Sequence, residues 1–151
     1  MAKTWRSHPN WDIALRLLKS VRPGSTGYDP DDVAGIVPAD WAVFQTEGPD
    51  VTVGEELLGR VASQLSGVVV VVTFASYLRL AGPFFVASSQ LLPLISEHAE
   101  AFDDPFFSGD VTIVAPKTGT VVLVHHDGLL AVLSGELSLA FDDDATSSQE
   151  S

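Results

Sequence analysis

The chain contains no cysteine among its 151 residues. Without thiols it forms no disulfide, binds no zinc ion through cysteine and has no cysteine nucleophile. Basic residues are also few, since 8 lysines and arginines stand against 20 aspartates and glutamates, and the formal net charge is −12. Hydrophobic residues make up 46% of the chain, which is enough for a buried core, so we expect one folded domain.

The shortage of basic residues is most marked after residue 22. Residues 1–22 have a charge balance of +4, whereas residues 23–151 hold 3 basic residues against 19 acids, a balance of −16. An acidic body repels nucleic-acid phosphate and anionic lipid, so we expect neither nucleic acid nor a membrane as partner. It attracts basic proteins and speeds their encounter. A basic protein partner is therefore expected, and mimicry of nucleic acid is a weaker alternative.

Long uninterrupted apolar runs are absent as well. The most membrane-like stretch, 61–78, is interrupted by polar residues such as Ser63, Gln64 and Thr73, whereas a spanning helix needs about 20 predominantly apolar residues. Five consecutive valines at 68–72 favour a buried strand, because β-branched side chains suit strands. The first ten residues lack the apolar segment of a secretory signal, so we expect a cytoplasmic protein.

Periodicity and breakers predict three helices and several strands. An amphipathic helix is expected at 10–20, a second after the capping-box pattern Thr52-x-x-Glu55, and a third from Ser88, Ser89 or Pro93 to about Phe102. Apolar runs bounded by glycine and proline predict strands at 41–46, 68–78 and 84–87. The glycine- and proline-rich segment 23–40 is expected to be a long connector.

The clearest local pattern is a β-meander near the C-terminus. Short apolar runs separated by turn residues predict strands at 110–115, 120–126, 129–133 and 136–141, with Asp127-Gly128 in a type I′ turn. We therefore predict an α+β fold in two layers, with a mainly antiparallel sheet and about three helices. The domain is expected to span 1–141, followed by a disordered acidic tail at 142–151.

Familiar catalytic and cofactor motifs are absent. The sequence has no G-x-x-x-x-G-K-[ST], G-x-G-x-x-G, G-x-S-x-G or H-E-x-x-H pattern. We therefore expect no cofactor, no structural metal ion and no catalysis. The leading hypothesis is a small acidic protein-binding domain, of the kind that acts as an inhibitor or immunity protein by neutralising a basic partner. Self-association as a homodimer is left open.

One cluster, His125-His126-Asp127, supports an alternative hypothesis. On a strand, His125 and Asp127 lie on one side and His126 on the other, so the two histidines are not expected to share a site. A His-x-Asp pair serves as a general base with its orienting carboxylate, or as part of a metal site. A further group must come from His98, or from an acid among Asp103, Asp104 and Asp110. The alternative is thus a small enzyme or metal-dependent binding protein that uses His125, Asp127 and His98.

The loop at 103–110 is the expected contact surface for a partner. Phe106 and Phe107 form an aromatic pair, and acids flank them in sequence. Buried aromatic anchors dominate protein interfaces, and surrounding charges steer association. The predicted partner-binding residues are Asp103, Asp104, Phe106, Phe107 and Asp110.

A short stretch, Pro38-x-x-Trp41 followed by Gly48, resembles the proline-x-x-aromatic stretch of one group of immunity proteins. The resemblance covers this stretch only. It assigns no role to any residue of the chain.

Overall fold

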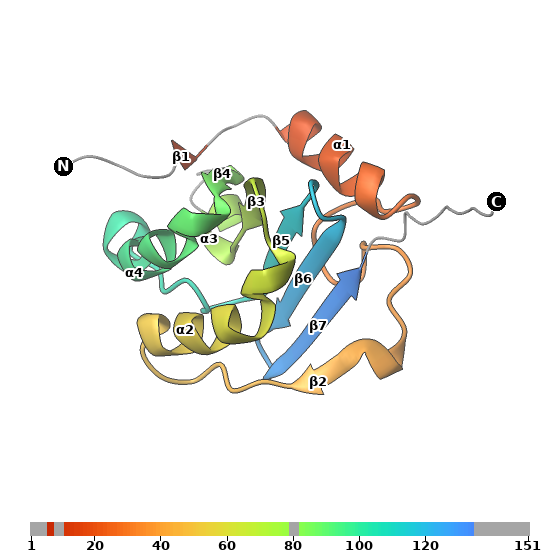
Figure 1. The fold of residues 1–151 in the computed structure, drawn as a ribbon. Helices are drawn as coiled ribbons and strands as arrows, with labels where there is room; N and C mark the ends of the chain where they lie inside the picture. Colours follow the sequence, from red (N-terminus) through yellow and green to blue (C-terminus); the bar gives the residue numbers. More distant parts are fainter. Residues whose placement is uncertain (1–5, 8–10, 79–81, 135–151) are drawn as a thin grey trace.

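The fold is built on a seven-stranded sheet, in which every pairing is antiparallel (Figure 1). The computed structural model describes residues 6–7, 11–78 and 82–134. The strand order is β1-β4-β3-β5-β6-β7-β2. The strands are β1 (Arg6–Ser7), β2 (Trp41–Val43), β3 (Val68–Val72), β4 (Phe84–Ala87), β5 (Val111–Ala115), β6 (Thr120–His125) and β7 (Leu129–Ser134). The predicted α+β class with a mainly antiparallel sheet is confirmed.

Helices cover the sheet on both sides. The helices are α1 (Trp11–Val21), α2 (Asp50–Val61), α3 (Phe74–Leu78) and α4 (Leu91–Phe102). Helices α2 and α4 share one hydrophobic core with one face of the sheet, whereas α1 and the connector share a second core with the other face. Gly54 of α2 lets the two helices approach closely, because a Cβ there would lie 3.0 Å from Ile95 Cγ2 of α4.

The packing of strand β3 explains why the valines at 69–72 are apolar without alternation. Val69 and Val71 belong to the core under α2 and α4, whereas Val70 and Val72 belong to the core under α1. Successive side chains of a strand point to opposite faces, so a strand covered on both sides is apolar at every position. The prediction of a central strand at 68–72 is confirmed.

The predicted extension of this strand to residue 78 is wrong. The chain turns into α3 at Phe74 instead. The backbone N–H of Thr73 donates to Ser76 Oγ at 3.0 Å, and the backbone N–H of Ser76 donates to the carbonyl of Thr73 at 3.0 Å. These local bonds replace the ladder of the strand, as serine and threonine often do at helix starts.

Helix α2 also begins earlier than predicted. It begins at Asp50 and follows an extended Pro49, so the capping box expected at Thr52 does not mark its start. The carboxylate of Asp50 accepts the backbone N–H of Phe106 at 2.7 Å and thus ties the helix to the 103–110 loop. The predicted helices at 10–20 and 88–102 are confirmed, with a 3₁₀ turn, Ser88–Gln90, before α4.

The meander is confirmed for β5, β6 and β7, but the turn between β6 and β7 differs from the prediction. His125 pairs with Leu129, so three residues form the loop, and Gly128 N–H donates to His125 O at 3.0 Å. Gly128 has a φ of 92°, whereas Asp127 has no positive φ, so the turn is not type I′. The predicted strand at 136–141 and tail at 142–151 lie outside the described residues.

Within the described ranges, none of the helices has both the length and the apolar character that crossing a membrane requires.

Candidate binding groove and histidine cluster

The connector between α1 and β2 folds back over the sheet and is fastened there by Arg22. The guanidinium of Arg22 donates to the carbonyls of Ala34 and Gly35, each at 3.1 Å, and to that of Ser134 at 3.4 Å. Gly35 has a φ of 85°, and a Cβ at this position would collide with the guanidinium. Arg22 therefore joins the connector to the end of β7.

Tyr28 fastens the middle of the connector. Its hydroxyl donates to the carbonyl of Ala14 on α1, and its own carbonyl accepts the hydroxyl of Thr112 on β5 at 2.6 Å. Val33 is buried nearby in the core under α1. The connector is long, but these contacts give it a defined path, so that it can form a wall.

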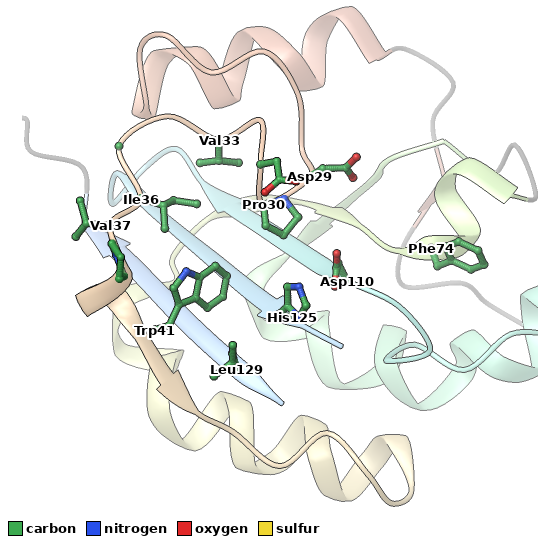
Figure 2. Close-up of a pocket in the computed structure, with 13 residues that line it drawn as sticks. Asp29, Pro30, Val33, Ile36, Val37, Trp41, Phe74, Asp110, His125 and Leu129 are labelled. Carbon is green, nitrogen blue, oxygen red and sulfur yellow. The ribbon is translucent and has the colours of Figure 1, made fainter. Parts of the chain in front are cut away.

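A groove of about 910 Å³ lies between this wall and the sheet (Figure 2). Trp41 of β2 and His125 of β6 lie beneath the connector, with ring centroids 6.1 Å apart and nearly perpendicular planes. The groove is lined by Asp29, Pro30, Asp31, Val33, Gly35, Ile36, Val37, Pro38, Trp41, Phe74, Asp110, His125 and Leu129.

The lining combines apolar walls with charge of one sign. Valine, isoleucine, leucine, proline and aromatic side chains form most of it. The carboxylates are those of Asp29, Asp31 and Asp110, and no lysine or arginine in the described part of the chain lines the groove. A ligand that suits this lining therefore carries positive charge together with apolar surface.

The histidine cluster lies at one end of the groove. Sheet register brings its parts together, because Val111 pairs with Val124 and so places Asp110 beside His125. The ring of His126 stacks on that of His125, with centroids 4.6 Å apart and planes 19° apart. The expectation that the two histidines lie apart is wrong, because the strand ends at His125 and the turn redirects His126.

Asp110 holds His126 by two hydrogen bonds, and the carboxylate of Asp127 lies close to both rings. Asp110 Oδ1 accepts the backbone N–H of His126 at 2.9 Å and its ring Nδ1 at 2.7 Å. Asp127 Oδ2 lies 3.6 Å from His125 Nδ1, and its Oδ1 lies 3.4 Å from His126 Nε2. The hydrogen bond to Asp110 raises the pKa of His126 above its ordinary value.

His98, the third residue of the alternative hypothesis, is not part of this cluster. It is fully buried in α4, where its ring contacts those of Phe84, Phe102 and Phe106. Its Nδ1 lies 2.7 Å from the carbonyl oxygen of Asp104 and its Nε2 lies 2.9 Å from Thr73 Oγ1. Burial lowers the pKa of His98, so the ring is a neutral structural group of the core. A site made of His125, Asp127 and His98 is therefore not formed.

The predicted aromatic anchors are also in the core. Phe106 is 0% exposed and Phe107 is 7% exposed, and their rings contact each other with centroids 4.8 Å apart. Neither can insert into a partner, because the loop folds its aromatic residues inward under α2 and α4. Asp103 is exposed at the C-terminal end of α4 in the left-handed conformation, and Asp104 accepts the hydroxyl of Ser108 at 2.9 Å.

Of the five residues predicted to contact a partner, only Asp110 lines the groove. Asp29, Asp31 and Trp41 were not predicted as site residues. They lie far from the histidines in the sequence. Trp41 comes close to His125 only because β2 pairs with β7 at the edge of the sheet. The acids of the proline-rich connector were the one available signal.

Comparison of the chain with protein-family models, with curated proteins and with solved structures gives no significant match.

Proposed function

We propose that this protein is a non-catalytic protein-binding domain that takes up a basic, partly apolar segment of a partner protein in the groove and thereby neutralises that partner. The observation that carries the proposal is the lining of the groove, where Asp29, Asp31 and Asp110 lie among apolar side chains and the lining residues that the structure describes include no lysine or arginine. Lysine and arginine side chains combine a cationic head with an apolar stem, so both parts of such a side chain find matching surface.

Exposed apolar side chains lie in the groove and on β2. Val37, which lines the groove, is 52% exposed, and Val43 of β2 is 82% exposed. Strand β2 is also at the edge of the sheet. An extended apolar surface beside an acidic groove supports a protein segment as the ligand rather than a small cation.

The overall charge supports the same class of partner. The balance of −16 over residues 23–151 creates a field that attracts a basic protein before contact. Charge of this kind mainly raises the association rate, whereas contacts inside the groove mainly slow dissociation. We therefore expect the association rate to fall as the salt concentration rises, and the dissociation rate to depend much less on salt.

The proposal is tested with three synthetic peptides of equal length, which alternate arginine with leucine, arginine with serine and glutamate with leucine. Isothermal titration calorimetry in the presence of a chelator measures each affinity. We expect the arginine–leucine peptide to bind most tightly, the arginine–serine peptide more weakly and the glutamate–leucine peptide not at all. Equal affinity for both arginine peptides would contradict a role for the apolar walls.

A pair of variants with matched charge separates the groove from the general field. Asp29→Asn with Asp31→Asn removes two groove charges, whereas Glu55→Gln with Glu100→Gln removes two exposed charges from α2 and α4. We expect the groove pair to weaken binding of the arginine–leucine peptide by about 2- to 30-fold, from about 0.2–1 kcal/mol for each of the two charges. The control pair should have a clearly smaller effect. Equal effects would show that the peptide senses only net charge.

A further inference from the structure

We propose that Asp110, His125 and His126 form a binding site for one divalent transition-metal ion at the end of the groove. Each of the three residues offers a ligand atom, and these atoms lie within 4.8 Å of one another. Two imidazoles and a carboxylate are ligands that Zn²⁺, Ni²⁺ and Cu²⁺ accept, whereas Mg²⁺ and Ca²⁺ prefer oxygen alone. The proposal stands apart from the peptide-binding function and does not depend on it.

The frame of the site is the sheet itself. Asp110 directly precedes β5, and His125 is the last residue of β6, two neighbouring strands whose register is fixed by five residue pairs. His126 follows at the start of a turn closed by the bond from Gly128 N–H to His125 O. Metal sites placed on paired strands are held with little loss of entropy on binding.

Side-chain movement brings the ligand atoms to metal distance. In a tetrahedral site with ligands about 2.0–2.2 Å from the zinc ion, two ligand atoms lie about 3.3–3.6 Å apart, so the atoms that now lie within 4.8 Å of one another move closer together. The side chain of His126 is 54% exposed, so its ring can shift toward the ion without disturbing the core. Its Nδ1 exchanges the hydrogen bond to Asp110 Oδ1 for the ion, which the same carboxylate then also binds.

Asp127 adds a second carboxylate beside the ion. Its Oδ1 lies 3.4 Å from His126 Nε2, whereas its backbone N–H donates to His125 Nδ1 at 3.1 Å. A metal-bound imidazole is commonly oriented by a carboxylate at its other ring nitrogen, and that arrangement strengthens the ligand. Asp127 is thus a positioning residue, while Asp110, His125 and His126 hold the ion.

The site opens into the groove. Asp110 and His125 line the groove, so one side of the ion faces it. Three protein ligands leave at least one coordination position for water or for a donor atom of a bound molecule, as in open metal sites. The ion would add positive charge next to the acids of the groove and thereby change which ligands the groove accepts.

The first measurement uses Zn²⁺ alone, titrated by calorimetry into the full chain without peptide. We expect one ion per chain with a dissociation constant in the micromolar range or below. Asp110→Asn, His125→Gln and His126→Gln should each weaken binding by about 10-fold or more. Glu55→Gln, a charge-matched control on α2, should leave it unchanged. Unaltered binding in all three ligand variants, or no saturable binding by the parent chain, would overturn the proposal.

A second measurement needs no substitution and therefore holds even if a variant fails to fold. Co²⁺ added to ¹⁵N-labelled protein broadens or shifts the amide signals of residues near the ion. We expect the strongest broadening at 110 and at 125–127, and only shifts that weaken with distance over α2 and α4. A Co²⁺ effect centred elsewhere on the chain would refute this site, even if calorimetry finds one ion bound. The metal titrations contain no peptide, and the peptide titrations contain a chelator. A negative result for the metal site therefore leaves the peptide-binding proposal untouched, and the reverse also holds.

Discussion

The carboxylate of Asp110 accepts two hydrogen bonds from His126, one from its backbone N–H at 2.9 Å and one from its ring Nδ1 at 2.7 Å. This relationship joins the start of β5 to the turn between β6 and β7. Asp110 also lines the groove, together with His125. These two hydrogen bonds thus connect the residue before β5 to the turn that carries His126.

Asp110→Asn should lower the pKa of His126. The hydrogen bond to Asp110 is the largest cause of the raised pKa, and an amide stabilises the imidazolium less than a carboxylate does. NMR titration of the ring signals of His126 in chelated protein measures the change. Asp127→Asn should lower the pKa by less, since Asp127 contributes only through its charge. A larger effect from Asp127→Asn would contradict the geometry.

His98 should make the fold less stable as the pH falls. Burial, the largest cause, lowers its pKa in the folded chain below that of the unfolded chain, so the unfolded state takes up the proton first. The stability from the neutral ring is present above about pH 6.5, the ordinary value, and is lost as the pH falls toward the lower pKa of the folded state. His126, whose pKa is raised, contributes with the opposite sign.

His98→Gln isolates this contribution. Denaturant unfolding at pH 7.5 and 5.5 should show a smaller loss of stability in the variant than in the parent chain. At pH 7.5 the variant should be less stable by about 1–3 kcal/mol, because the bonds to Thr73 and to the carbonyl of Asp104 are disturbed. An identical pH dependence in the two proteins would show that His98 is not the group that titrates.

Val70→Asp should prevent folding. Val70 is fully buried, and it lies in the centre of the sheet between Phe85 of β4 and Val114 of β5. An unpaired buried charge costs several kcal/mol, close to the whole stability of a domain, which is about 5–15 kcal/mol. Val68→Asp is the matched control, because Val68 belongs to the same strand but is 58% exposed. Circular dichroism should show the control folded and Val70→Asp unfolded, and a folded Val70→Asp chain would refute the packing of β3.

Arg22→Met should loosen the wall of the groove. It removes the three bonds to the carbonyls of Ala34, Gly35 and Ser134, at a cost of about 1.5–3 kcal/mol. Amide hydrogen exchange should become faster at 24–36, and the arginine–leucine peptide should bind more weakly. Arg16→Met, which removes an exposed arginine of α1, controls for the lost charge. Equal effects of the two variants would contradict the fastening role of Arg22.

Local patterns in the sequence predict much of this fold, because the features involved are set by neighbours along the chain. Neighbouring residues suffice to predict β3 from its valines, α1 from its amphipathic pattern and the meander from its turn residues. The end of β3 was missed because it is marked by local hydrogen bonds, from the Thr73 N–H to Ser76 Oγ and from the Ser76 N–H to the Thr73 carbonyl. An apolar pattern does not reveal such bonds. The backbone N–H of Phe106 likewise donates to the carboxylate of Asp50, a residue distant in the sequence.

The site was harder to predict than the fold. The sequence identifies His125, Asp127 and Asp110 as candidates, but the choice of Asp110 over His98 as their neighbour comes from the register between β5 and β6. The other half of the groove comes from the connector and from Trp41, which reaches the histidines only because β2 returns to pair with β7. Relationships of this kind depend on strand order, which local patterns do not specify.

The most direct test of the account locates the bound peptide on the protein. Amide and indole signals of ¹⁵N-labelled protein are recorded while the arginine–leucine peptide is added in the presence of chelator. We expect the largest shifts at 29–38, at Trp41, at Asp110 and at 125–129, and almost none over α2 and α4. Shifts centred on α2 and α4, or spread evenly over exposed acids, would contradict the groove as the binding site for a basic partner.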